Sequence, residues 1–573
     1  MTFGFGLGLT KGGGAGGLPA FAANFIGGSL PTGSTFSRGT IGTFYNQSGL
    51  IATASTDVAR FDYDPGNMLQ QNLLTYSNDF TNAIWAAGSP VSYTLIPGAI
   101  TGPDGTASGT QITSVSGVAA TCRNFTATST TATFSIYVKQ GTTPTSSTNF
   151  LLRNGTTAVQ LSSINLAGSV ATGTSSIMSV GNGWYRVVLT ATTGISIGDT
   201  LGLYYGATGS VVPGQYWYLY GGQLNEGSTA LPYLATTSTA QTVCAPRGLL
   251  IEEARTNAMF PSQTISVWTL NGTGSVADNT LVSPDGATDA SQITATTNGS
   301  GCWKSTTVTT ATVYTASLYL KAISGGSTIL VGTDVGVAVA ATLTFNMLTG
   351  AITSPGASVT SSGATYVGNG WWRVWWTFTT NSTTSDILAY GSAGQVYGMY
   401  GAQLEAGAYA TSYIPTTSAT VTRNFDNLSI TSTNFASWFN QTTGTFAIQY
   451  DVGCSYATAP AAFTVNPGAG FNAAATGNAR WWNSSTNVST ANAVTTLNTT
   501  RKEAMAYAAS SRAICLNGGA VASDANVPFP GALTGMYFGS AYGGGTQNIN
   551  GHILSFSYYN YTLTNAQLQG ITT

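Results

Sequence analysis

The feature that most constrains the fold of this 573-residue chain is an internal duplication. Residues 180–187 (VGNGWYRV) return as residues 367–374 (VGNGWWRV), and residues 220–224 (YGGQL) return as residues 400–404 (YGAQL). Two further pairs keep the same order, namely 103–105 with 284–286 (both PDG) and 134–139 (FSIYVK) with 316–321 (ASLYLK). Ordered matches at a nearly constant separation indicate one module of about 180 residues written twice.

The residues within each copy favour β-structure. Side chains of a strand point alternately to its two faces. In the second copy one predicted core stripe consists of Trp372, Val374, Trp376 and Phe378. The opposite face carries Trp371, Arg373, Trp375 and Thr377. Glycine and Ser/Thr clusters recur about every 8–15 residues, as in β-sandwiches and jelly rolls. The sequence therefore predicts an all-β fold of tandem β-sandwich and jelly-roll domains.

The chain is too long for one hydrophobic core, so we expect several domains. The repeat and the junctions around it predict an N-terminal region 1–66, sandwich copy one at 67–245, sandwich copy two at 246–424 and a C-terminal domain at 425–573.

Composition narrows the classes of partner. Charged residues make up 6% of the chain and the net charge is −2, whereas hydrophobic residues reach 43%. A chain without clustered Lys and Arg lacks the electrostatic basis for binding nucleic acid. No stretch of about 20 apolar residues predicts membrane insertion. The N-terminus lacks the basic start of a secretory signal, so we expect synthesis in a reducing cytosol.

Catalytic and metal-binding motifs are absent from the sequence. His552 is the only histidine, and we expect it to play a structural role at an edge of the C-terminal domain. No CxxC, P-loop or nucleophile elbow is present, so no cofactor or metal is predicted. Asp62 and Asp64 would share one strand face and could hold a cation or act on a glycan, but the favoured interpretation is a structural junction tied down by Arg60 or another base.

Other charged residues suggest structural pairs. Glu252 and Glu253 are expected to pair with Arg247 and Arg255. Within each sandwich, Arg186 with Glu226 and Arg373 with Glu405 are expected to form ion pairs.

Aromatic residues point to sugar binding, because aromatic rings can stack on the apolar face of a pyranose ring. The candidate glycan-binding residues are Trp217 in the YWYLY strand, Trp371, Trp375, Trp481 and Trp482. For each of them, packing in a core or between subunits is the competing interpretation.

Several segments carry a family resemblance. Residues 60–65 (RFDYDP), 72–80 (NLLTYSNDF) and 247–257 (RGLLIEEARTN) resemble tailed-bacteriophage fibre and head-spike proteins. In that family the RFDYDP segment usually runs directly into the GLLIEE segment, but here a sandwich module separates them. Residues 428–573 resemble concanavalin A-like, laminin-G-like jelly rolls. Such domains often bind calcium, but Asp451 is an isolated candidate ligand without a visible ligand set.

The resemblance implies a phage virion surface protein, a fibre or spike. The missing catalytic motifs predict that it has no enzymatic activity. Its N-terminus would anchor it to the capsid or tail, with Phe3, Phe5, Leu7 and Leu9 as candidate contacts for strand addition onto another virion protein. Its sandwiches would attach to host-surface polysaccharide, and the fibres of this family imply a homotrimer. Two alternatives stay open: a purely structural capsid decoration protein, and a polysaccharide depolymerase.

Overall fold

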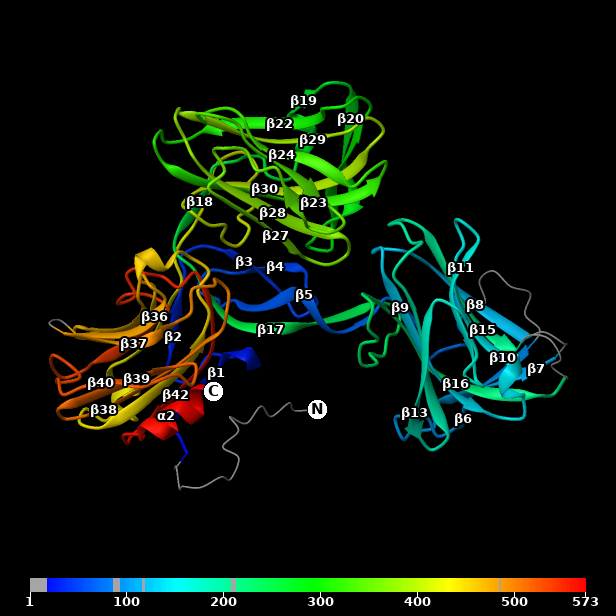
Figure 1. Ribbon diagram of the computed structural model, residues 1–573, viewed down its shortest axis with the longest axis horizontal. Helices are drawn as coiled ribbons and strands as arrows, with labels where there is room; N and C mark the ends of the chain where they lie inside the picture. The colour runs from blue at the N-terminus through cyan, green and yellow to red at the C-terminus, as the bar shows by residue number, and fades with distance from the viewer. Residues whose placement is uncertain (1–17, 86–92, 116–118, 208–212, 484–485) are drawn as a thin grey trace.

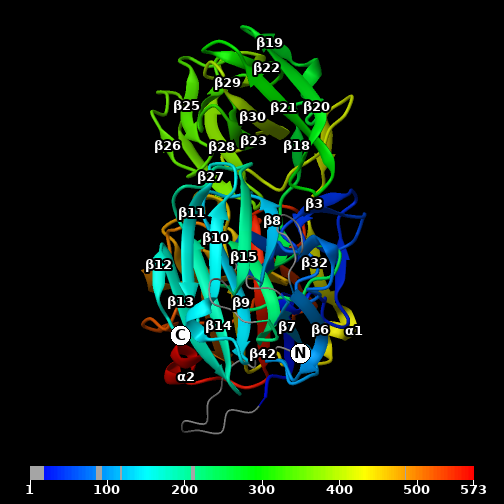
Figure 2. The ribbon, with the colours of Figure 1, turned by 90° about the vertical axis from the view of Figure 1, so that its right-hand side faces the viewer.

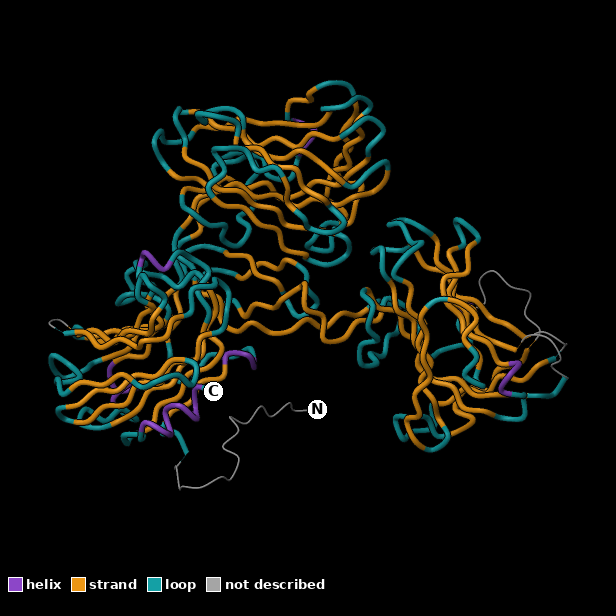
Figure 3. The backbone as a smooth tube through the Cα atoms, viewed as in Figure 1, coloured by secondary structure: helices purple, strands orange, loops and turns teal. Residues whose placement is uncertain are grey.

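The computed structural model describes residues 18–85, 93–115, 119–207, 213–483 and 486–573. These residues form three β-rich bodies, namely sandwich copy one, sandwich copy two and a jelly roll (Figure 1). Helices are few and short, as Figure 3 shows. The turned view in Figure 2 places copy two above the other two bodies. The predicted all-β fold of tandem sandwiches is confirmed.

Both sandwiches share one topology. Copy one has sheets ordered β13-β14-β9-β16-β7-β6 and β12-β11-β10-β15-β8. Copy two has sheets ordered β27-β28-β23-β30-β21-β20 and β26-β25-β24-β29-β22-β19. Apart from the extra strand β19, each position in one copy has its counterpart in the other, which confirms the duplication.

The strands of copy one are β6 (Tyr93–Ile100), β7 (Gly109–Ser114), β8 (Ala119–Thr126), β9 (Ala132–Gln140), β10 (Thr148–Asn154), β11 (Val159–Asn165), β12 (Val170–Thr172), β13 (Thr174–Gly181), β14 (Trp184–Ala191), β15 (Thr200–Ala207) and β16 (Tyr216–Glu226). Those of copy two are β19 (Thr269–Asn271), β20 (Gly274–Val282), β21 (Thr288–Ala295), β22 (Ser300–Thr307), β23 (Val313–Ser324), β24 (Thr328–Thr333), β25 (Ala341–Asn346), β26 (Ile352–Thr353), β27 (Ser361–Tyr366), β28 (Trp371–Thr379), β29 (Thr384–Gly391) and β30 (Val396–Ala406).

The shared Tyr-Gly-x-Gln-Leu motif builds a β-bulge in each copy. Gly221 and Gly401 have φ values of 57° and 60°, in the left-handed region that favours glycine. The amide of Gln223 donates to Leu231 O at 2.9 Å and its oxygen accepts from Leu234 N at 2.8 Å. The motif therefore fixes the local chain path of the fold rather than a binding site.

The core stripe predicted for β28 is confirmed. Val374, Trp376 and Phe378 are fully buried in the core of copy two, and Trp372 packs against the same core. Their burial between the two sheets is what holds the sandwich together.

The third body is a jelly roll of two sheets, ordered β40-β39-β38-β33-β42-β17-β5 and β2-β32-β41-β34-β35-β36-β37. Its strands from the C-terminal part of the chain are β32 (Asn427–Thr431), β33 (Gly444–Tyr450), β34 (Ala461–Asn466), β35 (Ala469–Ala473), β36 (Asn478–Asn483), β37 (Asn487–Ala493), β38 (Arg501–Ala508), β39 (Ser511–Leu516), β40 (Ala522–Asp524), β41 (Gly535–Phe538) and β42 (Gly551–Tyr559). Two short helices, α1 (Ser432–Ala436) and α2 (Asn565–Thr572), accompany them, and α2 begins at a capping box formed by Thr564 and Gln567.

The N-terminal part of the chain contributes strands to the jelly roll. Strand β1 (Phe21–Asn24) pairs with β42, and β2 (Thr35–Ser37) pairs with β32. Two strands of region 1–66, β1 and β2, therefore belong to the sheets of this body. Strands of three and four residues show too little alternation to predict such long-range pairing from sequence. The anchor candidates Phe3, Phe5, Leu7 and Leu9 lie outside the described residues.

Copy one is inserted into a β-hairpin of this body. Strand β5 (Phe61–Asn72) runs out and β17 (Gln241–Ile251) runs back, with Phe61 opposite Leu249 and Asn72 opposite Gln241. The RFDYDP and GLLIEE segments are thus neighbours in space although a sandwich separates them in sequence. Figure 1 shows the two strands as an arm reaching to copy one.

Copy two is also inserted at a strand pair, formed by β18 (Arg255–Asn257) and β31 (Val421–Arg423). A short hairpin of β3 (Gly42–Tyr45) and β4 (Ile51–Ala54) lies between this sandwich and the β5–β17 arm (Figure 1). We call it the N-terminal hairpin.

Candidate functional site

A cleft lies where copy two, the N-terminal hairpin, the β5–β17 arm and the jelly roll meet. It has a volume of about 300 Å³ and is lined by side chains from all four parts. Clefts at the junction of domains are common ligand sites. We call it the junction cleft.

The wall from copy two presents an arginine and a tryptophan. Arg373 and Trp375 are two residues apart on β28, so their side chains share a face. The guanidinium of Arg373 lies 5.6 Å from the ring centre of Tyr319 and donates to Ser317 Oγ at 3.0 Å. Arg373 forms no ion pair within the described residues, and its Nε is buried without a partner.

Trp375 is half-buried and packs over Gly363 of β27. A Cβ at residue 363 would lie 2.6 Å from the indole ring, so glycine lets the ring lie flat against the strand. The indole N–H makes no hydrogen bond to the described residues. Trp375 therefore brings an indole ring and a hydrogen-bond donor to the cleft.

His552 lies between two carboxylates at the floor of the cleft. Its Nδ1 is 3.1 Å from Asp451 Oδ2 and its Nε2 is 3.0 Å from Asp62 Oδ2. Arg247 lies 3.7 Å from Asp451 Oδ2. These side chains come from β42, β5, β17 and the end of β33, so they tie the arm to the jelly roll.

The position of His552 differs from the expected edge of the domain. Strand β42 lies between β33 and β17, because the upstream arm extends the sheet beyond it. Both ring nitrogens face carboxylates, so neither is left to act as a base toward a nucleophile. Asp64 does not join this cluster but accepts from Gly66 N at 3.0 Å.

A buried charge network adjoins the cleft, and its members Glu252 and Ser412 line the cleft wall. Glu252 accepts from Ser412 N and Ser412 Oγ, each at 2.7 Å, and pairs with Arg60 at 2.7 Å and with Arg423. Burial opposes the ionised form, but Arg423 and Arg60 hold the pKa of Glu252 well below its usual value. Asp426 joins the network by pairing with Arg60 and Arg38.

This network corrects the expected pairing of the two glutamates. Glu253 pairs with Arg255 as predicted, but Glu252 pairs with Arg60 and Arg423 instead of Arg247. The partners lie 192 and 171 residues away in sequence (252 − 60 and 423 − 252), so no local spacing could indicate this pairing.

The expected ion pairs inside the sandwiches are wrong. Arg186 donates to Ser135 Oγ at 2.8 Å and Leu231 O at 2.6 Å, and Arg373 has the partners given above. Glu405 accepts from Gln403 and Thr411 in place of Arg373. Glu226 follows its Gln-Leu motif by two residues and Glu405 follows its own by one, and a shift of one residue turns a strand side chain to the other face. The two glutamates therefore do not play equivalent roles.

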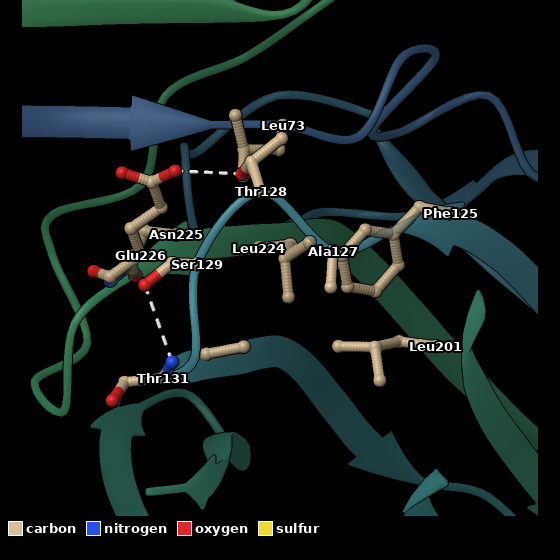
Figure 4. Close-up of a pocket in the computed structure, with 11 residues that line it drawn as sticks. Leu73, Phe125, Ala127, Thr128, Ser129, Thr131, Leu201, Leu224, Asn225 and Glu226 are labelled. Atoms are coloured by element: carbon tan, nitrogen blue, oxygen red, sulfur yellow. Dashed lines mark hydrogen bonds between the residues drawn. The ribbon is translucent and has the colours of Figure 1, made fainter. Parts of the chain in front are cut away.

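Glu226 instead links the two sandwiches beside a small hollow in copy one (Figure 4). Thr128 Oγ1 donates to Glu226 Oε1 at 2.7 Å, and Tyr366 OH of copy two donates to Oε2 at 2.7 Å. The hollow measures about 10 Å³, which is space for about one water molecule. The hollow is therefore too small for a sugar, and Glu226 serves the contact between the two sandwiches.

The five tryptophan candidates lie in different environments. Trp217, Trp371 and Trp481 are at most 1% exposed and belong to packed cores. Trp482 is half-buried on the jelly roll, 6.0 Å from the ring of Tyr542. Trp375 alone among the five lines the junction cleft.

Several cleft residues were not identified from the sequence. Tyr409 donates to Glu253, and Asn550 Nδ2 donates to Tyr409 OH at 2.8 Å. Asn498 and Thr365 line the same cleft with exposed side chains. They come from four separate segments and share no motif, so no local pattern could have grouped them.

The histidine cluster predicts a dependence of stability on pH. Burial and Arg247 disfavour the imidazolium, but Asp451 and Asp62 outweigh them and raise the pKa of His552 above 6.5. Protonated His552 therefore stabilises the folded state fully below about pH 6.5, and this stabilisation is lost as the pH rises through the raised pKa. For Asp451, burial favours the neutral form, but His552 and Arg247 lower its pKa below 3.8, so its contribution is lost as the pH falls.

The junction is therefore expected to be most stable between about pH 4 and pH 6.5. Calorimetry from pH 6 to pH 9 should show a falling Tm for the jelly-roll transition, and a smaller fall in His552→Gln. An equal fall of Tm with pH in wild type and in His552→Gln would contradict the assignment of this pH dependence to His552.

Two further findings concern the described residues. They contain no group of three or more His, Cys, Asp or Glu side chains placed to hold a metal ion. None of their helices has the length and apolar character needed to cross a membrane.

Comparisons with known proteins do not assign the chain to a family. No protein-family model matches the chain, and the search of curated proteins finds no relative. Among solved structures, the chain is similar to the tandem CBM22-1–CBM22-2 domains of Xyn10C from Paenibacillus barcinonensis, with a TM-score of 0.20, 12% identity and coverage of 61% of this chain and 100% of that chain.

Two other solved structures are similar over much of their length. The ANXUR1 extracellular domain from Arabidopsis thaliana has a TM-score of 0.17 and 8% identity, covering 56% of this chain and 89% of that chain. The LG1–3 region of the laminin α2 chain has a TM-score of 0.15 and 9% identity, covering 79% and 96%. Likenesses at these TM-scores carry no argument about ligand or activity.

Proposed function

We propose that this chain is a non-catalytic phage virion surface protein that attaches to host-surface polysaccharide through the junction cleft. The observation that carries the proposal is the pairing of Arg373 and Trp375 on one cleft wall. An indole ring can stack on a sugar ring, and a guanidinium without a carboxylate partner can bind an acidic substituent.

The surrounding polar groups fit a saccharide. Asn498, Thr365 and Ser361 have exposed side chains in the cleft and can exchange hydrogen bonds with sugar hydroxyls. The carboxylates are already engaged, Asp62 by His552 and Glu252 by two arginines. The cleft therefore favours a glycan that carries acidic residues over a neutral one.

The resemblance of residues 60–65 and 247–257 to fibre and head-spike proteins supports a virion setting. In that setting the N-terminal segment would contact capsid or tail proteins, and the protein would be a homotrimer. Light scattering of the purified protein tests the trimer, and labelling of intact virions tests the location.

Replacing Trp375 with alanine should weaken polysaccharide binding about tenfold or more, because truncating a tryptophan anchor typically costs about 2 kcal/mol. The measurement is binding of the full chain to an array of acidic and neutral host polysaccharides, at low and at high salt. Wild-type protein should prefer acidic polymers and lose part of its affinity in salt.

Trp482→Ala is the matched control, since Trp482 is also half-buried but lies outside the cleft. It should bind like wild type. Equal binding by wild type and Trp375→Ala would reject the cleft as the site. No binding to any polymer would favour the structural decoration protein, and shortening of the polymer during incubation would favour the depolymerase.

A further inference from the structure

Each sandwich carries the same cluster of three tyrosines on the outer face of one sheet. We call these clusters the tyrosine faces: Tyr137, Tyr220 and Tyr233 in copy one, and Tyr319, Tyr400 and Tyr413 in copy two. Their ring centres lie 5.4–6.0 Å apart in copy one and 5.8–6.1 Å apart in copy two.

The support beneath the two faces is also the same. Tyr233 OH lies 2.8 Å from Ser77 Oγ, and Tyr413 OH lies 2.6 Å from Ser262 Oγ. The guanidinium of Arg186 lies 5.5 Å from the ring centre of Tyr137, as that of Arg373 lies 5.6 Å from Tyr319. The two faces are thus built as copies of one surface.

In copy two the N-terminal hairpin covers this surface. Tyr45 OH lies 3.1 Å from Tyr319 OH, and Ile51 N donates to Pro284 O at 3.0 Å. The side chains of Tyr45 and Ile51 pack against the cluster that contains all three tyrosines. The molecule therefore shows what a tyrosine face binds, namely the end of a β-hairpin.

In copy one the described residues leave the same surface exposed. Val180 is 39% exposed, whereas its counterpart Val367 is 3% exposed. Pro103 is exposed where Pro284 is buried. Tyr137 and Tyr233 are half-buried, whereas their counterparts in copy two are buried.

Two polar groups of the open face lack the partners that the hairpin supplies in copy two. Tyr137 OH, the counterpart of Tyr319 OH, makes no hydrogen bond within the described residues. Pro103 O, the counterpart of Pro284 O, likewise accepts none from them. Both groups are positioned for a hydroxyl and a backbone N–H from an occupant.

From this we propose that the tyrosine face of copy one is a docking surface for a β-hairpin of a partner protein. The hairpin would carry a tyrosine and a branched aliphatic residue at the positions that Tyr45 and Ile51 occupy on copy two. A polypeptide is favoured over a sugar because the equivalent contact in copy two uses a backbone N–H and aliphatic packing. This inference does not rest on the junction cleft.

The test uses the chain's own hairpin as the probe. A cyclised peptide of residues 42–54 is added to the full-length protein, whose copy-two face is already covered. Calorimetric titration should show one saturable site, with binding weakened about tenfold or more in Tyr137→Ala. A peptide with Tyr45 and Ile51 replaced by alanine should bind no better than that variant.

Two variants keep the result interpretable. Tyr137→Phe retains the ring and should lower affinity a few-fold through loss of one hydrogen bond. Tyr185→Ala removes an exposed tyrosine on the opposite face of the neighbouring strand and should leave binding unchanged. The proposal is overturned by no peptide binding at millimolar concentration, by binding that survives Tyr137→Ala, or by a polysaccharide that binds at Tyr137 while the peptide does not.

Discussion

Replacing Asp426 with alanine should lower the free energy of unfolding of the jelly-roll body by about 3–5 kcal/mol. Asp426 Oδ1 accepts from Arg38 at 3.1 Å, and Oδ2 accepts from Arg60 and from Glu252 N at 2.9 Å. The side chains of Asp426, Arg38 and Arg60 are all 0% exposed. Removing the carboxylate leaves two buried guanidinium groups with too little negative charge beside them.

Calorimetry measures the effect, which should appear as a Tm lower by roughly 10 °C for a body of this size. Asp79→Ala provides the control, because Asp79 is exposed and bonds only within its own turn. The Asp79→Ala substitution should lower the free energy of unfolding by less than about 1 kcal/mol. A similar small cost for Asp426→Ala would show that the network adds little to stability.

The second large effect separates two tryptophans four residues apart. Trp371→Ala should lower the free energy of unfolding of copy two by about 3–5 kcal/mol, the usual range for deleting a buried aromatic side chain. Trp371 is 0% exposed, packs against the tyrosine face of copy two, and donates from Nε1 to Val282 O at 3.0 Å. Trp375→Ala should leave the fold intact and reduce glycan binding instead.

Copy one supplies the matched test of this distinction. Trp184 is 1% exposed and donates to Thr101 O at 3.0 Å, so Trp184→Ala should destabilise copy one as Trp371→Ala destabilises copy two. Denaturant unfolding followed by circular dichroism measures both. If Trp371→Ala unfolds at the wild-type denaturant concentration, its assignment to a core is wrong.

These two tryptophans also show how far sequence could predict the structure. Alternation correctly assigned Trp372, Val374, Trp376 and Phe378 to the core, and the repeat predicted two equivalent sandwiches. The same alternation placed Trp371 on the outer face of the sheet, which is also correct. Alternation within one strand could not show that residues 43–51 cover that face, because the covering segment lies more than 300 residues upstream.

The candidate site was less predictable than the fold for the same reason. His552 was visible as the only histidine, but its partners Asp62 and Asp451 come from other segments of the chain. Local patterns report which face a side chain occupies, whereas the cleft depends on which faces meet. The short strands β1 and β2 were missed because three or four residues carry no usable periodicity.

The insertion of copy one between β5 and β17 has a consequence for how such a protein can change. Asn72 and Gln241, where the chain enters and leaves the sandwich, are directly opposed partners in one antiparallel ladder. A module whose two ends lie side by side can be lost, duplicated or exchanged without altering the path of the chain around it. The arm is thus an attachment point at which the module can be replaced while the jelly roll keeps its architecture.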